Sequence, residues 1–219
     1  MIIGFIPIRV GSKSIPLKNV KLINGKPLAQ WVIDISNKSK YIEKTVVSTD
    51  SEIISNKINS CDIFWRTLET AIDTASSELP LIEFCNGCNL DDIIVFLQAT
   101  SPLITSNEID LGIEKILKNE YDSIVSVVRQ KKFIWDEDGI PKYDLENRPR
   151  RQDWNGFFVE NGGFYISKVE DILKSKCRIS GKIGMIECGE ETYYEIDEPM
   201  DWIIIESLLK NKYGNFCRY

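Results

Sequence analysis

The sequence predicts an α/β protein with a doubly wound, mostly parallel sheet. Short apolar or β-branched runs alternate with segments of helical periodicity from residue 2 through residue 128, as they do in consecutive βα units. The run at residues 92–97, DIIVFL, is nearly all apolar, as a central parallel strand covered on both faces would be. The chain of 219 residues is long enough for one well-cored domain, and we expect residues 1–219 to form it.

Each element of the first half has a local signal. The run that starts at Ile2 is apolar and broken only by Gly4, which suits a buried strand. Further strands are expected at residues 45–48, 62–65, 92–97 and 122–128. Apolar residues at helical spacing predict the helices between them, marked by Leu28/Trp31/Val32/Ile35, by Ile53/Ile54/Ile58, by Leu79/Ile82/Phe84 and by the stretch from Ser106 or Asn107 to Leu117. The crossovers between parallel strands should be right-handed.

Residues 129–158 break this rhythm. Glycines and prolines interrupt any regular element here, and two tryptophans accompany the basic run RPRRQD at residues 148–153. We therefore expect an excursion of loops or a hairpin rather than another βα unit. Exposed aromatic and arginine side chains are common in protein interfaces, so the excursion is a candidate contact surface.

Shorter elements complete the chain. The turn signal at Asn161 and Gly162 separates two expected strands, and a short helix follows at residues 168–173. The strands expected in this part lie at residues 157–159, 163–166, 183–186 and 193–196. Pro199 then opens an amphipathic helix whose apolar residues are Trp202, Ile203, Ile205, Leu208 and Leu209.

Composition argues against several classes of function. The net charge is −6, which disfavours binding to nucleic acid. No apolar run approaches the roughly 18 residues of a membrane span, and the chain enters its first strand without a signal peptide, so we expect a cytoplasmic protein with no membrane partner. Positive charge is nevertheless concentrated in the opening loop and between Arg129 and Arg151, which suits a small anionic ligand.

The six cysteines include a C-x-x-C pair, Cys85 and Cys88. Such a pair raises the alternatives of a zinc site or a redox centre. Zinc would need further ligands at close spacing, but the chain contains no histidine, and Cys177 and Cys188 are poorly spaced. Free thiols are therefore the favoured interpretation.

The opening strand runs directly into a cationic loop. Arg9, Lys13 and Lys18 supply fixed positive charge. Ser12 adds a hydroxyl, and Gly11 lets the backbone approach a ligand closely. An α/β sheet commonly holds phosphate on such a loop at the carboxyl ends of its strands. The alternative is an ordinary solvated loop, since neither the GxxxxGK[ST] nor the GxGxxG pattern is present.

The loop sequence RVGSKSIPLKN, residues 9–19, resembles the RGGSKGIPRKN signature of the acylneuraminate cytidylyltransferase family, which makes CMP-sialic acids and related CMP-nonulosonates. Val10 and Ser14 replace family glycines, and the side chain at position 10 narrows the approach to the phosphates. The resemblance implies a Rossmann-like nucleotidyltransferase fold. Further along, the match includes Arg66, Asp73 and Ser77. The nucleotide-binding residues so implied are Arg9, Gly11, Ser12, Lys13, Lys18, Asn19, Arg66 and Ser77, with Arg9, Lys13 and Lys18 also assigned to catalysis.

A second motif, Glu195-Ile196-Asp197, carries two carboxylates. On a strand, residues i and i+2 lie on the same face, so Glu195 and Asp197 should point the same way. Mg²⁺ prefers one or two carboxylates together with phosphate oxygens and water, although a solvated strand end is the simpler alternative. EIDEPMD at residues 195–201 is similar to the family's Asp-Ile-Asp followed by another Asp, with a glutamate in the first place. The resemblance thus implies Mg²⁺ as cofactor, held by Asp197, which is also assigned to catalysis, and by Glu195.

The remaining matches concern an acidic sugar. LQATSPL at residues 97–103 follows the most apolar strand and resembles the family's LQPTSPL, although a structural turn explains it equally well. NGGFY at residues 161–165 resembles NGAIY, and an Arg-Gln pair at residues 151–152 resembles one whose arginine reaches the sugar's carboxylate across a dimer. The sugar-binding residues so implied are Gln98, Arg151, Asn161 and Tyr165, with Lys131 or Lys132 as a further cation.

Together these features predict a Mg²⁺-dependent enzyme that transfers CMP from CTP to the anomeric hydroxyl of a nonulosonic acid and releases pyrophosphate. The resemblance implies a homodimer in which residues 129–158 form the dimerisation and sugar-binding excursion. Because several positions depart from the family pattern, GTP in place of CTP, or an octulosonate as the sugar, stays an alternative. A nucleotide-sugar binding protein without catalytic activity on the same fold is a third.

Overall fold

The computed structural model describes residues 1–11, 14–70 and 76–214. Within them, a seven-stranded sheet has the order β5-β4-β1-β6-β8-β7-β9, and only β8 runs antiparallel to its neighbours. The strands are β1 (Ile2–Pro7), β4 (Lys44–Thr49), β5 (Asp62–Trp65), β6 (Ile93–Leu97), β7 (Ser123–Gln130), β8 (Phe157–Lys168) and β9 (Ile183–Glu187). The prediction of a mostly parallel α/β sheet is confirmed.

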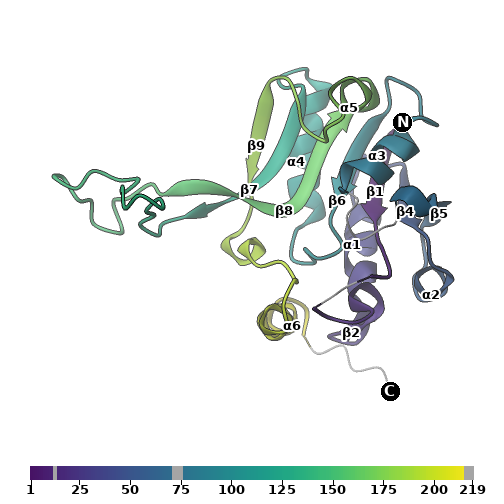
Figure 1. The fold of residues 1–219 in the computed structure, drawn as a ribbon, viewed down its shortest axis with the longest axis horizontal. Coiled ribbons are helices and arrows are strands. Elements are labelled where there is room, and N and C mark those ends of the chain that lie inside the picture. The colour runs from purple at the N-terminus through teal and green to yellow at the C-terminus, as the bar shows by residue number, and fades with distance from the viewer. Residues whose placement is uncertain (12–13, 71–75, 215–219) are drawn as a thin grey trace.

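Helices cover both faces of the sheet, as Figure 1 shows. They are α1 (Leu28–Asn37), α2 (Glu52–Ser55), α3 (Glu78–Cys85), α4 (Ser106–Leu117), α5 (Val169–Ser175) and α6 (Pro199–Tyr213). Apolar residues of α1, α2 and α4 share one buried cluster with the sheet, and those of α3 and α5 share another. The two clusters on opposite faces make the sheet doubly wound.

The central strand and its neighbours follow the sequence pattern closely. All five residues of β6 are buried, as a strand packed on both faces requires. The helix that follows it, α4, begins with a reciprocal cap, in which the Thr105 hydroxyl accepts from the Glu108 amide and the Glu108 carboxylate accepts from the Thr105 amide. Local signals are therefore sufficient to position this βα unit.

A third buried cluster holds the C-terminal helix α6 against the start of the chain. Trp202, Ile205 and Leu209 pack with Leu28 and Trp31 of α1. A short hairpin, β2 (Leu22–Ile23) with β3 (Lys26–Pro27), lies between the opening loop and α1, after the 3₁₀ turn η1 (Lys18–Val20). This packing brings the residues just before α6 next to the opening loop.

Two expectations about strands are wrong. The strands predicted at 157–159 and 163–166 form the single strand β8, whose pairing with β7 is irregular between Val125 and Val127. There the Ser126 hydroxyl accepts from the Phe164 amide, and Gly162 has φ +63°. Residues 193–196 form no strand, because the 3₁₀ turn η3 (Glu190–Tyr193) runs into irregular chain. Hydrogen bonds to distant side chains override the local pattern at both places.

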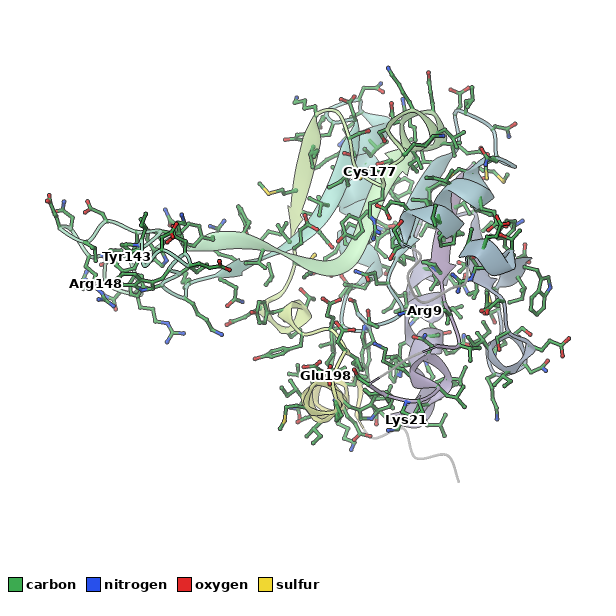
Figure 2. The ribbon with its side chains drawn as sticks, in the orientation of Figure 1. Arg9, Lys21, Tyr143, Arg148, Cys177 and Glu198 are labelled. Atoms are coloured by element: carbon green, nitrogen blue, oxygen red, sulfur yellow. The ribbon has the colours of Figure 1, made fainter. Side chains whose placement is uncertain are left out.

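The excursion expected at residues 129–158 is an arm. β7 and β8 continue past the sheet as a ribbon, and the residues between them form the tip, which lies far from the body in Figure 1. The aromatic rings of Phe133 and Tyr143 lie 4.5 Å apart, and the Arg148 guanidinium lies 4.7 Å from the Phe133 ring centroid. Figure 2 shows Tyr143 and Arg148 together on this arm. A small aromatic cluster thus gives the arm its own packing.

Close packing at Gly163 yields a prediction. A Cβ at this position would lie 2.6 Å from Ile104 Cγ2, so Gly163→Ala should lower the free energy of unfolding by about 1–3 kcal/mol. The substitution Ile104→Ala removes the opposing methyl group and should recover part of this loss in the double mutant, as urea denaturation would show.

Ile104→Val is the matched control, because valine keeps the Cγ2 methyl and should give no recovery. Strictly additive effects of Gly163→Ala and Ile104→Ala would contradict this account of the contact.

Candidate active site

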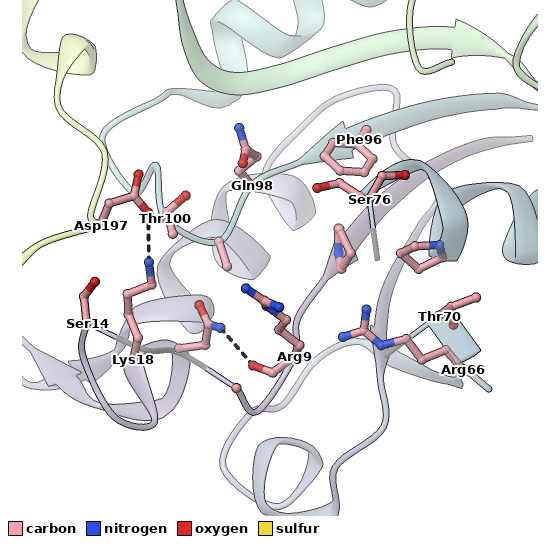
Figure 3. Close-up of a pocket in the computed structure, with 16 residues that line it drawn as sticks. Arg9, Ser14, Lys18, Arg66, Thr70, Ser76, Phe96, Gln98, Thr100 and Asp197 are labelled. Atoms are coloured by element: carbon pink, nitrogen blue, oxygen red, sulfur yellow. Dashed lines mark hydrogen bonds and ion pairs between the residues drawn. The ribbon is translucent and has the colours of Figure 1, made fainter. Parts of the chain in front are cut away.

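A cavity of about 350 Å³ opens at the carboxyl ends of β1 and β6. These two strands are neighbours, and the chain winds away from them in opposite directions, so the cavity lies at the switch point where α/β sheets bind ligands. The residues that line it are Pro7, Arg9, Gly11, Ser14, Lys18, Asn19, Arg66, Thr70, Ser76, Ser77, Pro80, Phe96, Gln98, Ala99, Thr100 and Asp197. Figure 3 shows the charged side chains of this set converging on the cavity.

Most of the predicted nucleotide-binding residues lie together here. Of the eight, the structure brings six to the cavity wall, which are Arg9, Gly11, Lys18, Asn19, Arg66 and Ser77. The other two, Ser12 and Lys13, lie outside the described residues, as does the matched Asp73. The structure thus brings these six residues, from segments far apart in the chain, to one cavity, and their role in nucleotide binding stays a prediction.

Arg66 is a buried cation at one end of the cavity. Its side chain is 4% exposed, and one guanidinium nitrogen donates to the Ile8 carbonyl, while Asp50 lies 3.9 Å away. Burial lowers the pKa of Arg66, and Asp50 opposes that shift. Within the described chain, the Arg66 Nε–H has no hydrogen-bond partner. A buried donor of this kind is costly unless a ligand completes it.

Asn19 adds a buried acceptor to the same cavity. Its amide nitrogen lies 3.4 Å from the Arg9 carbonyl, to which it donates, and its Oδ1 atom is buried with no partner in the part of the chain that the structure describes. Asn19 and Arg66, which both line the cavity, thus each hold a buried polar atom that no described residue satisfies. A polar ligand with groups of both kinds fits such a wall.

Lys18 joins the opening loop to the segment before α6. Its ammonium donates to the Ile196 carbonyl at 2.6 Å and to the Asp197 carboxylate at 3.1 Å. Ser14 makes a parallel link, because its hydroxyl donates to Glu198 at 2.9 Å. The Ile196 amide donates to the Thr100 carbonyl at 2.9 Å. Three stretches of chain thus meet at one edge of the cavity.

Glu195 and Asp197 lie on the two sides of this junction, although they are not on a strand. Between them, Ile196 is fully buried in the third cluster. Burial raises the pKa of Glu195, and the nearby Asp197 carboxylate raises it further. A Cβ at Gly162 would lie 2.6 Å from both Glu195 Oε2 and Gln98 Nε2. The Glu195 carboxylate therefore lies near the side chain of Gln98, which lines the cavity. Asp197 itself lines the cavity.

Glu195 and Asp197 fit a magnesium ion whose remaining coordination positions are filled by phosphate oxygens and water. A cation would stabilise the ionised form of Glu195 beside Asp197, and Mg²⁺ takes one or two carboxylates plus phosphate oxygens. Asp201 is committed to the cap of α6, because its carboxylate accepts from the amides of Asp197 and Glu198. Among residues 1–11, 14–70 and 76–214, no group of three or more His, Cys, Asp or Glu side chains could hold a metal.

The predicted sugar-binding residues are spread over three places. Gln98 lines the cavity. Asn161 is buried, and its amide accepts from Ser126 at 2.6 Å and donates to Thr192 at 2.8 Å. Tyr165 is also buried, and its hydroxyl donates to Glu160 at 3.0 Å. The structure therefore places these two inside the protein, where they fix the irregular part of β8 rather than line the cavity.

Arg151 lies at a second cavity, of about 900 Å³, at the base of the arm. Lys131, Lys132 and Arg151 line it from the arm, and Tyr193 and Tyr194 line it from the body. None of these residues lines the first cavity of the same chain. Within one chain, the structure does not bring Arg151 and Gln98 to a common site.

Several residues that line the first cavity were not singled out as ligands in the sequence. Phe96 belongs to the all-apolar central strand, and the apolar pattern of that strand predicts a core residue. Its side chain is buried, and it also lines the cavity. Thr70 and Ser76 flank the stretch 71–75 without a periodic signal. Thr100 sits within the LQATS turn, where the residue pattern alone allows a purely structural role.

Burial disfavours the reactive thiolate at the Cys85 and Cys88 pair. Cys61, Cys85, Cys88, Cys177 and Cys188 are free, and Cys217 lies outside the described residues. Burial raises the pKa of Cys85 to about 12 and also raises that of Cys88. A thiol is the weak form of cysteine as nucleophile and metal ligand, so this pair lacks the activation expected of a redox centre.

Comparison with known proteins places this geometry in a family. A family model described as cytidylyltransferase matches residues 3–195. The chain is 37% identical over 216 residues to N-acylneuraminate cytidylyltransferase A of Danio rerio, covering 90% of this chain and 48% of that protein. It is 30% identical over 225 residues to CMP-N,N'-diacetyllegionaminic acid synthase of Legionella pneumophila, covering 95% of this chain and 96% of that one. The chain thus spans about half the length of the vertebrate relatives it matches.

Solved structures confirm the fold. CMP:2-keto-3-deoxy-manno-octonic acid synthetase complexed with CTP superposes with a TM-score of 0.72 at 15% identity, covering 96% of this chain and 99% of that one. 4-Diphosphocytidyl-2C-methyl-D-erythritol synthase from Anaerococcus prevotii superposes with a TM-score of 0.70 at 12% identity, covering 95% and 96%. Separately, none of the helices described here has the length and apolar character needed to cross a bilayer.

The buried amide of Asn161 yields a prediction. Asn161→Ala would remove the acceptor of the Ser126 hydroxyl and the donor to the Thr192 hydroxyl, while each hydroxyl keeps one other bond, so it should lower the free energy of unfolding by about 1–3 kcal/mol in urea denaturation. Gln98→Ala, at the cavity wall, is the comparison and should change stability by no more than about 0.5 kcal/mol. Equal stability of the two variants would show that Asn161 is not a structural residue.

Proposed function

The chain belongs to the cytidylyltransferase family, and we propose that it transfers CMP from CTP to the anomeric hydroxyl of a nonulosonic acid, releasing pyrophosphate. The observation that carries the proposal is the cavity at the switch point, whose wall holds the three cations Arg9, Lys18 and Arg66 together with Asp197, which Lys18 contacts. Three fixed cations suit a triphosphate, and one carboxylate suits the cation that accompanies it.

The choice of sugar rests on the named relatives. One is called an N-acylneuraminate cytidylyltransferase and another a CMP-N,N'-diacetyllegionaminic acid synthase, and both names describe CMP transfer to nine-carbon sugar acids. The second relative is matched over nearly its whole length. The cytoplasmic location expected from the sequence stays a prediction.

The proposed step is an in-line displacement at phosphorus. The anomeric oxygen of the sugar forms a bond to the α-phosphorus of CTP, and the bond from that phosphorus to the oxygen bridging to the β-phosphate breaks. Pyrophosphate leaves with the bridging oxygen and the bonding electron pair. The sequence has no histidine, so we assign the hydroxyl proton to a carboxylate or to solvent.

The chain's own residues bind and orient the reactants. Arg9, Lys13 and Lys18 would stabilise the triphosphate and the charge that grows on the leaving pyrophosphate. Mg²⁺, the proposed cofactor, would offset negative charge at the α-phosphate, and Asp197 with Glu195 would hold it. Arg66 and Asn19 would form hydrogen bonds with the nucleotide. Gln98 would orient the sugar beside Glu195.

A homodimer is part of the proposal. The arm exposes apolar side chains that a second copy could cover, namely Ile134, Trp135, Ile140 and Leu145. Arg151 lies outside the first cavity of its own chain, so it would reach a sugar only in the site of a partner subunit. Light scattering should then give twice the 25.1 kDa chain mass, and a monomer at working concentration would contradict this part.

The assay for the function is pyrophosphate release with Mg²⁺, using CTP, GTP, UTP and ATP in turn with a panel of acidic nine- and eight-carbon sugars. We expect release with CTP and a nine-carbon acid. Release with GTP or with an octulosonate would keep the chemistry but reassign the substrate. CTP binding without release for any sugar would favour a binding protein and contradict the proposal.

Asp197 provides a sharper prediction. Asp197→Asn should lower kcat at least about 100-fold, because a neutral amide is a weak ligand for the metal that stabilises the transition state. Asp62→Asn is the matched control. The Asp62 side chain is 64% exposed and 3.0 Å from Lys44, and the Asp197 side chain is 65% exposed and 3.1 Å from Lys18. Asp62 is the first residue of β5 and so lies at the amino ends of the parallel strands, away from the cavity at their carboxyl ends.

The control variant should keep its full rate. A normal rate for Asp197→Asn, or equal losses in the two variants, would remove Asp197 from the catalytic site.

A further inference from the structure

An arginine outside the cavity packs against the back of its wall. Arg178 follows α5 in the sequence, next to Cys177, which Figure 2 labels. Its guanidinium carbon lies 4.3 Å from the ring centroid of Phe96 and 5.0 Å from that of Tyr165. Phe96 lines the cavity, but Arg178 does not. The arginine therefore touches the wall without reaching the space where a ligand would bind.

The same guanidinium is held by Glu78, the first residue of α3. Arg178 Nε donates to both carboxylate oxygens of Glu78, at 2.8 and 3.1 Å, and a terminal nitrogen donates to the second oxygen as well. The Arg178 amide also points to this carboxylate, at 3.4 Å. The Arg178 carbonyl accepts from the Ser167 hydroxyl of β8 at 2.7 Å. Both the backbone and the side chain of Arg178 are thus fixed.

The ion pair between Arg178 and Glu78 is well placed to hold its neighbours in position. The two side chains are only 16% and 22% exposed, so solvent screens them less than it screens a surface pair. The planar guanidinium can donate to a carboxylate and stack on rings at the same time, which an ammonium cannot do. The arrangement therefore depends on arginine itself, and not on positive charge alone.

Glu78 connects the pair to the second wall of the cavity. Ser76, Ser77 and Pro80 line the cavity, and they lie immediately before or within the first turn of α3. Arg178 thus holds the ring of Phe96 on one side and the start of α3 on the other. Elsewhere α3 packs through Leu81 and Cys85 on the sheet, in the same cluster as Phe96.

We propose that Arg178 and Glu78 are positioning residues for nucleotide binding, because they set the distance between Phe96 and the first turn of α3. The pair fixes the shape of the cavity end formed by Ser76, Ser77 and Phe96. Loss of the pair lets α3 and the Phe96 ring shift, so nucleotide affinity falls while the catalytic residues at the opposite edge stay in place. The inference rests on the proposed function for the identity of the ligand.

A second arginine provides a matched control. Arg129 donates to both oxygens of Glu187, at 2.8 and 3.0 Å, and its guanidinium carbon lies 4.1 Å from the Phe158 ring centroid. The chemistry is the same as at Arg178, but this pair joins β7 to β9 at the base of the arm. Neither Arg129 nor Phe158 lines the first cavity.

The experiment compares Arg178→Met, Arg178→Lys and Arg129→Met in the full chain. Calorimetric titration with CTP and Mg²⁺ should show about 10-fold weaker binding for Arg178→Met, and nearly as large a loss for Arg178→Lys, because lysine lacks the planar fork. Arg129→Met should bind CTP as the unmodified protein does. In turnover, the Arg178 variants should raise KM for CTP and leave kcat and KM for the sugar unchanged.

Each outcome has a defined meaning. Circular dichroism first establishes that every variant is folded, and if Arg178→Met does not fold, the comparison rests on Arg178→Lys and Glu78→Gln. Unchanged CTP affinity in folded Arg178 variants, full rescue by lysine, or equal losses of kcat and of both KM values would overturn the inference. Failure of the unmodified protein to bind CTP would instead contradict the proposed function.

Discussion

The site depends on the hydrogen bonds that the Lys18 ammonium donates. It joins the loop after the first strand to the segment before the last helix, bonding the Ile196 carbonyl and the Asp197 carboxylate across 178 and 179 positions of sequence. Lys18 adds to the Ser14–Glu198 hydrogen bond and to the third buried cluster, which hold the same two segments together. The Lys18 side chain is only 11% exposed, so its ammonium is partly removed from water, whereas the Asp197 side chain is 65% exposed.

The sign of the local charge at the cavity differs from the sign of the protein's net charge. The protein carries a net charge of −6, yet cations face the cavity at the carboxyl ends of β1 and β6. Arg66 is buried there with a donor, and Asn19 with an acceptor, that no residue in the described part of the chain satisfies. Such groups are destabilising in isolation, and proteins commonly retain them where a ligand completes them. The stability lost at this edge is offset by the apolar clusters on both faces of the sheet.

The sequence predicted the elements whose signals are local. The all-apolar β6, the span of α4 and the cationic loop are predictable because periodicity and charge act over a few residues, although the residue that caps α4 is Thr105 and not Ser106 or Asn107. The chain at 193–196 was expected to be a strand, but Ile196 is instead fixed by the Thr100 carbonyl and by Lys18. Such bonds join residues far apart in sequence, which no local pattern encodes.

The same limit explains the site residues that lie elsewhere. Motif similarity marked Asn161 as a ligand, whereas its amide bonds with Ser126 and Thr192 inside the protein. Phe96 was hidden in a strand pattern, although its ring faces the cavity, and Arg178 carried no signal in the sequence. A side chain that acts by holding another becomes visible only once the fold brings the two together.

The central claim is that the cavity between the opening loop and Gln98–Thr100 is the nucleotide site. A crystal structure of the protein grown with CTP and Mg²⁺ tests it most directly. The account predicts the triphosphate against Arg9 and Lys18, with Arg66 beside the nucleotide and Asp197 beside the metal. A nucleotide bound instead in the larger cavity at the base of the arm, away from all four residues, would contradict it.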